Sequence, residues 1–409
     1  MGTRDDRPFD LILYGATSFV GRILARRLVE RQGTTGPLRW AIAGRDAAKL
    51  ERIAVEVGAD VERIIADAAD PDALADLAGS TRVVVSTVGP YALYGSDLVA
   101  AVAAAGTDYC DLTGEPQWMR KMIDQHQATA EASGARIVHA CGFDSVPSDL
   151  GVWHIQQHAL ERFDEPCERV AMRVATMRGG ASGGTIASMM NLMEEAAADP
   201  SLRKLLADPR ALAPEDMRTG PPQPEVRGPK RDEASGQWVA PFVMAAVNTK
   251  VVHRTHALAG RRWGPAFTYD EAMLMGDGPL GAAKAGGLSA GLAAGMGLSA
   301  IGPARRALNR YVLPKPGEGP SPQAQEKGSF DIRFFGTTAS GNTIRTKVTG
   351  DRDPGYSGTA RMLAEAAVGL RELDRGEVGG GFWTPASALG DRLIERLEAH
   401  AGIRFDVVG

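Results

Sequence analysis

The first 140 residues alternate between short apolar runs and longer segments with helical periodicity, and this alternation constrains the fold more than any other feature. The apolar runs are Leu11–Tyr14, Trp40–Ala43, Arg63–Ala66, Val83–Thr87 and Ile137–Ala140. The helical patterns are Phe19–Gln32, Ala47–Val57, Pro71–Ala78, Ser96–Ala105 and Trp118–Ser133. Apolar strands that alternate with helices are typical of parallel sheets covered on both faces. The pattern predicts an α/β fold with a doubly wound, Rossmann-type parallel sheet.

The stretch GATSFVG connects the first apolar run to the first helical pattern, where such folds bind pyrophosphate at a helix N-terminus. Gly15 would allow a tight turn, and Gly21 would let the helix pack closely on the strand. Ser18 stands where the longer glycine pattern has its middle glycine, and its hydroxyl could bond a phosphate oxygen. The alternative is a glycine turn without a ligand. We predict a dinucleotide site here, with Thr17, Phe19 and Val20 among the cofactor-binding residues.

The end of the second apolar run, AIAGRD, bears on the choice of dinucleotide. An NAD enzyme usually places an acid about 20 residues beyond the glycines, to bond the ribose 2′-hydroxyl. Here Gly44 and Arg45 occupy that place, with Asp46 next and Lys49 one turn on. A guanidinium can hold a 2′-phosphate through two hydrogen bonds. Alternatively, Arg45 only opens a surface helix that Asp46 caps. We predict NADP(H) rather than NAD(H).

Other candidate residues follow later apolar runs, where ligands of open α/β sheets bind. Asp67 and Ala68 end the third run, near the expected adenine. The stretches STVGPYALYG and HACGFDSVPSDLG end the fourth and last runs and supply the remaining predicted cofactor contacts, which are Thr87, Val88, Gly89, Pro90, Gly142 and Phe143. Tyr91 follows Pro90 directly, near the expected nicotinamide. Between the two stretches, TDYCDLTGEP concentrates polar side chains: Asp108, Tyr109, Asp111, Thr113 and Glu115. Capping or turn chemistry is the alternative role for these residues.

Length and composition limit the class of protein. A chain of 409 residues exceeds one core of ordinary size, so two domains are expected. The net charge of −4 and the lack of a basic block argue against a nucleic-acid partner. Three cysteines without a C-x-x-C pair indicate no disulfide framework, and no metal-ligand spacing occurs. The first residues lack a signal-peptide core, so we expect a cytoplasmic protein.

The pattern changes after residue 150. Arg169–Thr176 and Phe330–Phe335 alternate like half-buried strands, and Thr343–Thr349 pairs with the latter across the turn ASGN. These strands predict a second, α+β domain on a mixed sheet, spanning 151–350 after a cofactor domain at 1–150. Residues 200–241 are proline-rich and predict a surface excursion or lid. Residues 351–409 return to a helical pattern.

One Gly/Ala-rich segment, residues 280–301, is just long enough to cross a bilayer, which needs about 20 apolar residues. However, Lys284 lies inside it, and its small residues are only weakly apolar. Gly287, Gly291 and Gly295 recur every four residues and would give a smooth face for close helix contact. Four basic residues follow and could meet anionic headgroups: Arg305, Arg306, Arg310 and Lys315. We predict a helix that packs in the second domain or at a homodimer contact, or lies on a membrane surface without spanning.

The motifs GATSFVG, AGR, TVGPYALYG, GTDYCDLTGE and HACGFDSVPSDLG, in this order and spacing, resemble the saccharopine dehydrogenase-like oxidoreductases. Within that group the chain is similar to the trans-acting enoyl reductases of actinobacterial lipid synthesis. Later stretches agree with this resemblance: GGASGGTIASM, PKPGEGPS, DPGYSGTA and WTPASALGD. The chain departs from the family at Ser18, where glycine is more common.

The resemblance implies an NADPH-linked reductase that serves a polyketide synthase lacking its own enoyl reductase, in phthiocerol or phenolic glycolipid synthesis. It also implies a lipid-like or carrier-bound substrate, and a C-terminal segment that packs back on the first domain. Reducing an enoyl thioester requires a donor to the developing enolate and an acid. Tyr91 is the first candidate for the donor and Tyr109 the second. A non-catalytic NADP-binding scaffold of a lipid assembly line, or a reductase for another substrate, are the alternatives.

Overall fold

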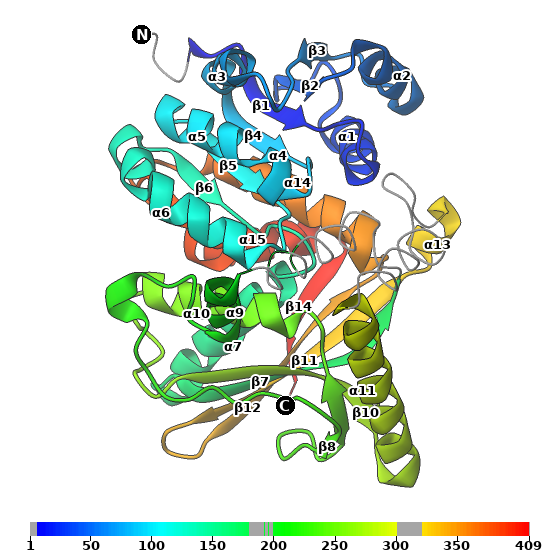
Figure 1. Cartoon of the computed structure of the whole chain (residues 1–409), viewed down its shortest axis with the longest axis vertical. Helices are drawn as coiled ribbons and strands as arrows, with labels where there is room; N and C mark the ends of the chain where they lie inside the picture. The colour runs from blue at the N-terminus through cyan, green and yellow to red at the C-terminus, as the bar shows by residue number, and fades with distance from the viewer. Residues whose placement is uncertain (1–5, 180–191, 193–194, 196–198, 301–320, 409) are drawn as a thin grey trace. The chain divides into compact units, whose positions relative to one another are not determined.

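The computed structural model describes residues 6–179, 192, 195, 199–300 and 321–408, which form two compact units (Figure 1). The first unit contains the described residues up to 143 together with 355–401. The second contains the described residues of 144–354 together with 402–408. Residues from the C-terminal part of the chain therefore contribute to both units.

The first unit is built on a seven-stranded parallel sheet, sheet A. Its order is β13-β6-β5-β4-β1-β2-β3, and the strands are β1 (Phe9–Tyr14), β2 (Trp40–Gly44), β3 (Glu62–Ile65), β4 (Thr81–Ser86), β5 (Asp108–Asp111), β6 (Arg136–Val138) and β13 (Gly381–Trp383). The central strands are buried along almost their whole length. Helices cover both faces of this sheet because its side chains are apolar on both sides. The predicted fold class is confirmed.

The helices of the first unit form two groups. One group contains α3 (Pro71–Ser80), α5 (Ser96–Ala105) and α6 (Pro116–Ser133), which contact one another in that order. The other contains α2 (Ala47–Val57), α1 (Phe19–Gln32), α14 (Thr359–Glu372) and α15 (Pro385–His400). Figure 1 shows α14, in orange, against the blue and cyan strands, and its contacts include β1, β4 and β5. A helix from the end of the chain thus completes the layer that α1 begins.

The sequence analysis missed two strands of sheet A. β5 consists of DYCD, which carries an acid at each end and was grouped with the polar residues around it, yet all four of its residues are buried. β13 has three residues and pairs with β6. β5 shows no apolar run because its burial depends on polar partners supplied by other elements. β13 is apolar but too short to stand out as a strand.

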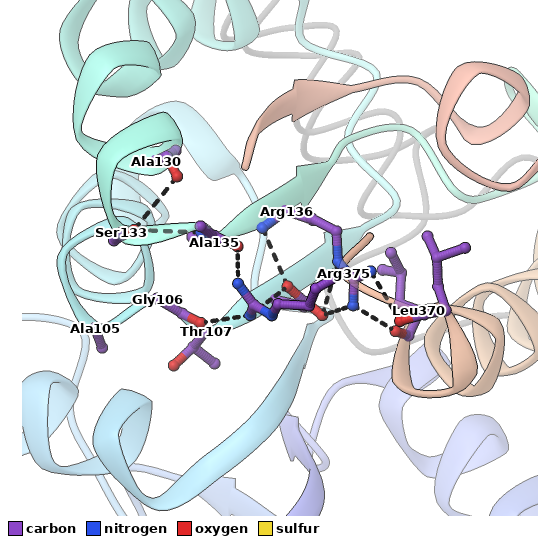
Figure 2. A network of polar contacts seen from close by, with 12 residues as sticks. Ala105, Gly106, Thr107, Ala130, Ser133, Ala135, Arg136, Leu370 and Arg375 are labelled. Atoms are coloured by element: carbon purple, nitrogen blue, oxygen red, sulfur yellow. Dashed lines mark hydrogen bonds and ion pairs between the residues drawn. The ribbon is translucent and has the colours of Figure 1, made fainter. Parts of the chain in front are cut away.

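A buried ion pair joins the amino ends of β5 and β6 to α14 (Figure 2). The Arg136 guanidinium donates to the Asp108 carboxylate from Nε at 3.1 Å and from Nη2 at 2.5 Å, and both side chains are almost completely buried. Arg136 also donates to the carbonyls of Leu370 and Leu373, near the end of α14. Arg375 adds a contact to Asp108 at 3.4 Å. Since ligands of such sheets bind at the opposite, carboxyl edge, we assign this network to stability.

The second unit is built on a mixed sheet, sheet B, as predicted. Its order is β14-β12-β11-β7-β10-β9-β8, with β7 (Cys167–Arg178), β8 (Lys230–Arg231), β9 (Trp238–Pro241), β10 (Thr268–Gly276), β11 (Ser329–Thr338), β12 (Thr343–Gly350) and β14 (Ile403–Val407). β7 and β10 are parallel, and the other pairs are antiparallel. α7 (Val146–Phe163) and α10 (Ala245–Leu258) pack on this sheet and on each other. The last strand, β14, lies in sheet B rather than with the helices that precede it.

The proline-rich stretch 200–241 contains regular structure, including α9 (Pro200–Ala207) and the strands β8 and β9. A buried ion pair anchors it, because Arg173 on β7 donates to both carboxylate oxygens of Asp232, at 3.0 and 2.7 Å. Asp270 on β10 lies 2.9 Å from the same guanidinium. Hydrogen bonds from Arg173 and Ser235 lower the pKa of Asp232 to about 2 against the opposing effect of burial. The pairing with sheet B does not fit a loosely attached lid.

The Gly/Ala-rich segment forms α11 (Gly278–Ala300), which contacts β9 and β10. Around Gly287 and Gly291 a methyl group would meet no atom within 4 Å, so nothing in the described chain uses the predicted smooth face there. The basic residues at 305–315 and the end of the segment, Ile301, lie outside the described residues. Within the part of the chain that the structure covers, no helix combines the length and hydropathy needed to cross a bilayer.

Candidate active site at the carboxyl edge of sheet A

The predicted cofactor residues gather at the carboxyl edge of sheet A. β1 lies between β2 and β4, and the chain runs outward from β1 in one direction through β2 and β3 and in the other through β4, β5 and β6. The loops after β1 and β4 therefore leave the sheet where the strand order reverses, which is the place at which open α/β sheets bind their ligands.

The loop between β1 and α1 requires glycine at both predicted positions. Gly15 has φ +90°, and a methyl group there would lie 2.6 Å from Val88 Cγ2. A methyl group at Gly21 would lie 2.2 Å from the Gly15 carbonyl oxygen. A side chain at either position would force the backbone apart, so these glycines bring α1 close to the end of β1.

Ser18 caps α1 rather than leaving its hydroxyl open. Its Oγ accepts from the backbone N–H of Gly21 at 2.8 Å and donates to Thr87 Oγ1 at 3.0 Å. Thr87 Oγ1 in turn donates to the Gly15 carbonyl at 2.9 Å. The serine that replaces the usual glycine thus joins the loop after β1 to the loop after β4.

The first turn of α1 offers free backbone donors. The N–H groups of Thr17, Phe19 and Val20 form no hydrogen bond with any described residue, and all three residues are only partly buried. Unpaired N–H groups at a helix N-terminus bind anions, because the helix dipole adds to their partial positive charge. The loop is therefore chemically suited to a pyrophosphate.

The turn after β2 contains Arg45 in an exposed position and without a hydrogen bond or ion pair to any described residue. The neighbouring acid is already used, because Asp46 caps α2 by accepting from the Lys49 N–H at 2.9 Å. The Lys49 ammonium lies 3.7 Å from the same carboxylate. Gly44 ends β2 and is buried. A guanidinium is thus available at this turn, and the carboxylate beside it is committed to the helix.

The end of β3 lies beside this turn. Ala66 donates from its N–H to the Gly44 carbonyl at 3.1 Å, and Asp67 and Ala68 follow directly. Burial raises the pKa of Tyr14, at the end of β1, to about 12, and the Asp67 carboxylate adds to the rise while Arg45 opposes it. Asp67 and Arg45 are therefore both close enough to act on the same ring, as contacts with one adenosine would require.

The loop after β4 holds Val88, Gly89 and Pro90 and leads into α4 (Tyr91–Tyr94). The Glu115 carboxylate accepts from the N–H groups of Tyr91 and Ala92, at 2.8 and 2.9 Å, and so caps this short helix. Glu115 is buried, and the sequence analysis gave it no specific role. Its position after β5 lets it hold the loop that follows the neighbouring strand.

The two candidate tyrosines are buried in the first unit. The Tyr91 hydroxyl donates to the Ser86 carbonyl at 3.0 Å and accepts from the Leu112 N–H at 3.4 Å. Burial raises the pKa of both Tyr91 and Tyr109 well above the usual range, and the Asp111 carboxylate adds to each shift. Both phenols therefore keep their protons at neutral pH. Their catalytic role stays a prediction.

Asp111 and His139 form a pair that the sequence analysis did not identify. Asp111 ends β5, and its Oδ2 lies 2.7 Å from His139 Nδ1, with both side chains buried. Asp111 Oδ1 accepts from the N–H of Ala140, whose φ of +61° ends β6 earlier than the apolar run suggested. The His139 ring lies among Tyr109, Trp118 and Phe382. Only strand pairing brings these residues together, because 28 positions separate the acid from the imidazole.

Gly142 and Phe143 lie just beyond β6 and end the N-terminal segment of the first unit. A methyl group on Gly142 would lie 3.2 Å from both Leu112 and Thr359, so the backbone passes close to the start of α14. The Phe143 N–H donates to Thr359 Oγ1 at 3.0 Å. α14 therefore helps to position the last predicted cofactor contacts.

The second unit contains a buried polar cluster that joins α7, α10 and β10. Glu271 accepts from the Tyr269 hydroxyl at 2.7 Å and from Asn248 Nδ2 at 3.0 Å. Asn248 Nδ2 also donates to Ser148 Oγ at 3.2 Å. Burial raises the pKa of Glu271 to about 7, although the hydrogen bonds from its neighbours oppose this shift.

This shift predicts a pH-dependent stability. The pKa of Glu271 is about 7 in the folded protein against 4.5 for an unperturbed group, so the folded state holds a proton that the unfolded state releases between these values. The free energy of unfolding should therefore fall as pH rises from about 4.5 to about 7. Glu271→Gln should be more stable than the parent above pH 7, by on the order of 3 kcal/mol, and similar to it near pH 4.

Urea denaturation across this pH range measures the effect. Glu233→Gln is the matched control, because Glu233 is exposed. A difference between Glu271→Gln and the parent that does not change with pH would contradict the assignment.

Comparison with known proteins identifies the family. No family model matches the sequence. The chain is 41% identical, over 98% of both chains, to a protein of Mycobacterium tuberculosis H37Rv named as a trans-acting enoyl reductase. It is 38% identical to the trans-acting enoyl reductase of Mycobacterium bovis BCG over 96% of both chains. The chain belongs to the trans-acting enoyl reductase family. The resemblance predicted from the motifs is confirmed.

A solved structure shares the fold. Apo saccharopine dehydrogenase (L-Glu forming) from Saccharomyces cerevisiae matches 98% of this chain and 100% of its own with a TM-score of 0.53 and 12% sequence identity. The trans-acting enoyl reductase family is a family of oxidoreductases, and this chain shares the fold of the yeast saccharopine dehydrogenase. Together they imply a nicotinamide cofactor.

Proposed function

We propose that this protein reduces an α,β-unsaturated thioester with NADPH. Family membership supports the reaction, and the exposed, unpaired Arg45 supports the choice of NADPH over NADH. When bound, the nicotinamide supplies a hydride to the β-carbon. The free N–H groups at the start of α1 would bind the pyrophosphate, and Arg45 would bind the 2′-phosphate.

Arg45→Ala tests the cofactor proposal. The parent should bind NADPH more tightly than NADH, and the variant should lose most of this preference. A lost charge-assisted phosphate contact costs about 1.5–3 kcal/mol, or roughly 10–100-fold in affinity. NADH affinity should change little, since NADH lacks the 2′-phosphate. Fluorescence titration of both nucleotides measures the four constants.

Arg31→Ala is the control for this experiment. Arg31 is exposed in the last turn of α1, at the opposite end of the helix from the proposed phosphate site. Its loss should leave both affinities unchanged. Equal affinities of the parent for NADPH and NADH would contradict the proposal.

Turnover separates an enzyme from an NADP-binding scaffold. An enoyl thioester of pantetheine, supplied with NADPH, should be reduced to the saturated thioester with equimolar NADPH oxidation. A scaffold would bind NADPH without turnover on thioesters of any chain length. The pantetheine link matters because a carrier-bound substrate presents this arm, and a free acid does not.

The biological setting is a further proposal from the family resemblance. We propose a polyketide synthase without its own enoyl reductase as the partner, in the synthesis of polyketide-derived lipids such as phthiocerol or phenolic glycolipids. Two further proposals rest on the sequence alone. One is that residues 280–301 contact a membrane surface, and the other is that the protein forms a homodimer. Co-sedimentation with anionic liposomes at low and high salt tests the first, and analytical ultracentrifugation tests the second.

A further inference from the structure

A π-helical turn from the C-terminal part of the chain packs on the proposed cofactor loop. The turn spans Pro354–Gly358 and leads directly into α14. It belongs to the stretch DPGYSGTA, to which the proposed function gives no role. From Gly355 onward the turn is part of the first unit, and its central residue, Tyr356, is 1% exposed. Such turns are rare and are frequent at functional sites, so we asked what Tyr356 contacts.

Tyr356 packs directly on Phe19, the first residue of α1. The two rings meet edge to face, with their centroids 4.7 Å apart and their planes at 68°. Aromatic pairs prefer this arrangement. The Arg22 guanidinium lies 5.6 Å from the centroid of the same Phe19 ring. These two contacts restrict a ring that is otherwise only half-buried.

The same segment makes a second contact with the candidate site. Thr359 begins α14 directly after the turn, and its Oγ1 accepts from the Phe143 N–H at 3.0 Å. α14 also packs along α1. One segment from the end of the chain therefore contacts both the loop after β1 and the loop after β6. Both loops contain predicted cofactor contacts.

We propose that Tyr356 is a positioning residue for the cofactor, because it fixes Phe19 and with it the first turn of α1. The Phe19 N–H is one of the three free donors proposed to bind the pyrophosphate, and holding the Phe19 ring restricts the direction of this N–H. A donor that is fixed in advance loses less conformational entropy when the anion binds, so the affinity is higher. The inference rests on the proposed function, since it requires the cofactor to bind at this loop.

Titration calorimetry of the full chain with NADPH and with NADH tests the inference. Tyr356→Leu removes the aromatic pair and should weaken the binding of each nucleotide by about 2–10-fold. The pyrophosphate is common to both nucleotides, so both affinities should fall by the same factor and the preference for NADPH should remain. Arg45→Ala should do the opposite and remove the preference. Tyr356→Phe keeps the ring and should bind like the parent.

Further variants separate positioning of the loop from a general loss of stability. Trp40→Leu is the matched control, because Trp40 is 3% exposed and begins β2, at the amino edge of sheet A. This control should lower the Tm without changing either affinity. Phe19→Leu should weaken both nucleotides as Tyr356→Leu does. The double variant should bind about as well as the weaker single variant, because residues that act through one contact do not give additive effects.

Unchanged nucleotide affinity in Tyr356→Leu would overturn the inference and leave the proposed function in place. The same holds if the effects of the two substitutions multiply in the double variant, or if Trp40→Leu loses as much affinity. Should Tyr356→Leu fail to fold, unchanged affinity in Phe19→Leu would overturn the inference equally. A parent that binds neither nucleotide would overturn both the inference and the proposed function.

Discussion

Arg136→Met should destabilise the first unit by about 3–5 kcal/mol, because it leaves a buried carboxylate without its main partner. Arg136 is 1% exposed and Asp108 is fully buried. The variant also removes the donor to the Leu370 carbonyl, which lies in the last turn of α14, where carbonyls have no partner within the helix. Asp108 keeps the bond from the Arg136 backbone N–H at 3.1 Å and the contact to Arg375 at 3.4 Å, but neither replaces the paired bonds of the Arg136 guanidinium.

Urea denaturation followed by circular dichroism measures this effect. Arg26→Met is the matched control, because Arg26 pairs with Glu56 at 3.4 Å while both side chains are about half exposed, at 47% each. Its loss should cost no more than about 1 kcal/mol. A similar loss of unfolding free energy in both variants would show that burial does not set the strength of the Arg136–Asp108 ion pair.

Tyr91→Phe should lower kcat by about 10²–10³ if the hydroxyl donates to the developing enolate, which is the cost of losing one such donor. Burial keeps the Tyr91 phenol protonated. Tyr91 is the first residue of α4, directly after the loop that follows β4. To reach substrate, the hydroxyl must exchange its bond to the Ser86 carbonyl. NADPH affinity should stay unchanged, since the hydroxyl does not contact the proposed phosphate site.

Steady-state kinetics with the pantetheine-linked substrate, combined with thermal unfolding, separate the two roles of Tyr91. Unchanged kcat with a lower Tm would assign the hydroxyl to the Ser86 bond alone. A raised KM at unchanged kcat would indicate uniform substrate binding. Tyr109→Phe, at the second candidate donor, provides the comparison of kcat and Tm. Tyr109 is also buried, and it lies on β5, the strand next to β4.

The first-unit fold could be predicted from local patterns because most of its strands are apolar on both faces. The expected helices at Phe19–Gln32, Ala47–Val57 and Ser96–Ala105 agree with the observed ones residue for residue. The start of α2 was predictable because its cap, Asp46, is local. β5 was missed because its polar residues are buried through partners far along the chain, of which Arg136 and His139 are two.

In the candidate site, the sequence determined the residue types and the turns that present them. The spacing of Gly15 and Gly21 between an apolar run and a helix was enough to predict a phosphate-binding loop, because the positive φ of Gly15 and the close approach of Gly21 to the Gly15 carbonyl are local features. The sequence alone also shows that Gly44 is followed by Arg45 and not by an acidic residue. The tertiary structure decided the partners: Ser18 bonds Thr87, Glu115 caps α4, and Asp111 meets His139. Hydrogen bonds between residues on different strands depend on strand order, and periodicity within one segment carries no information about that order.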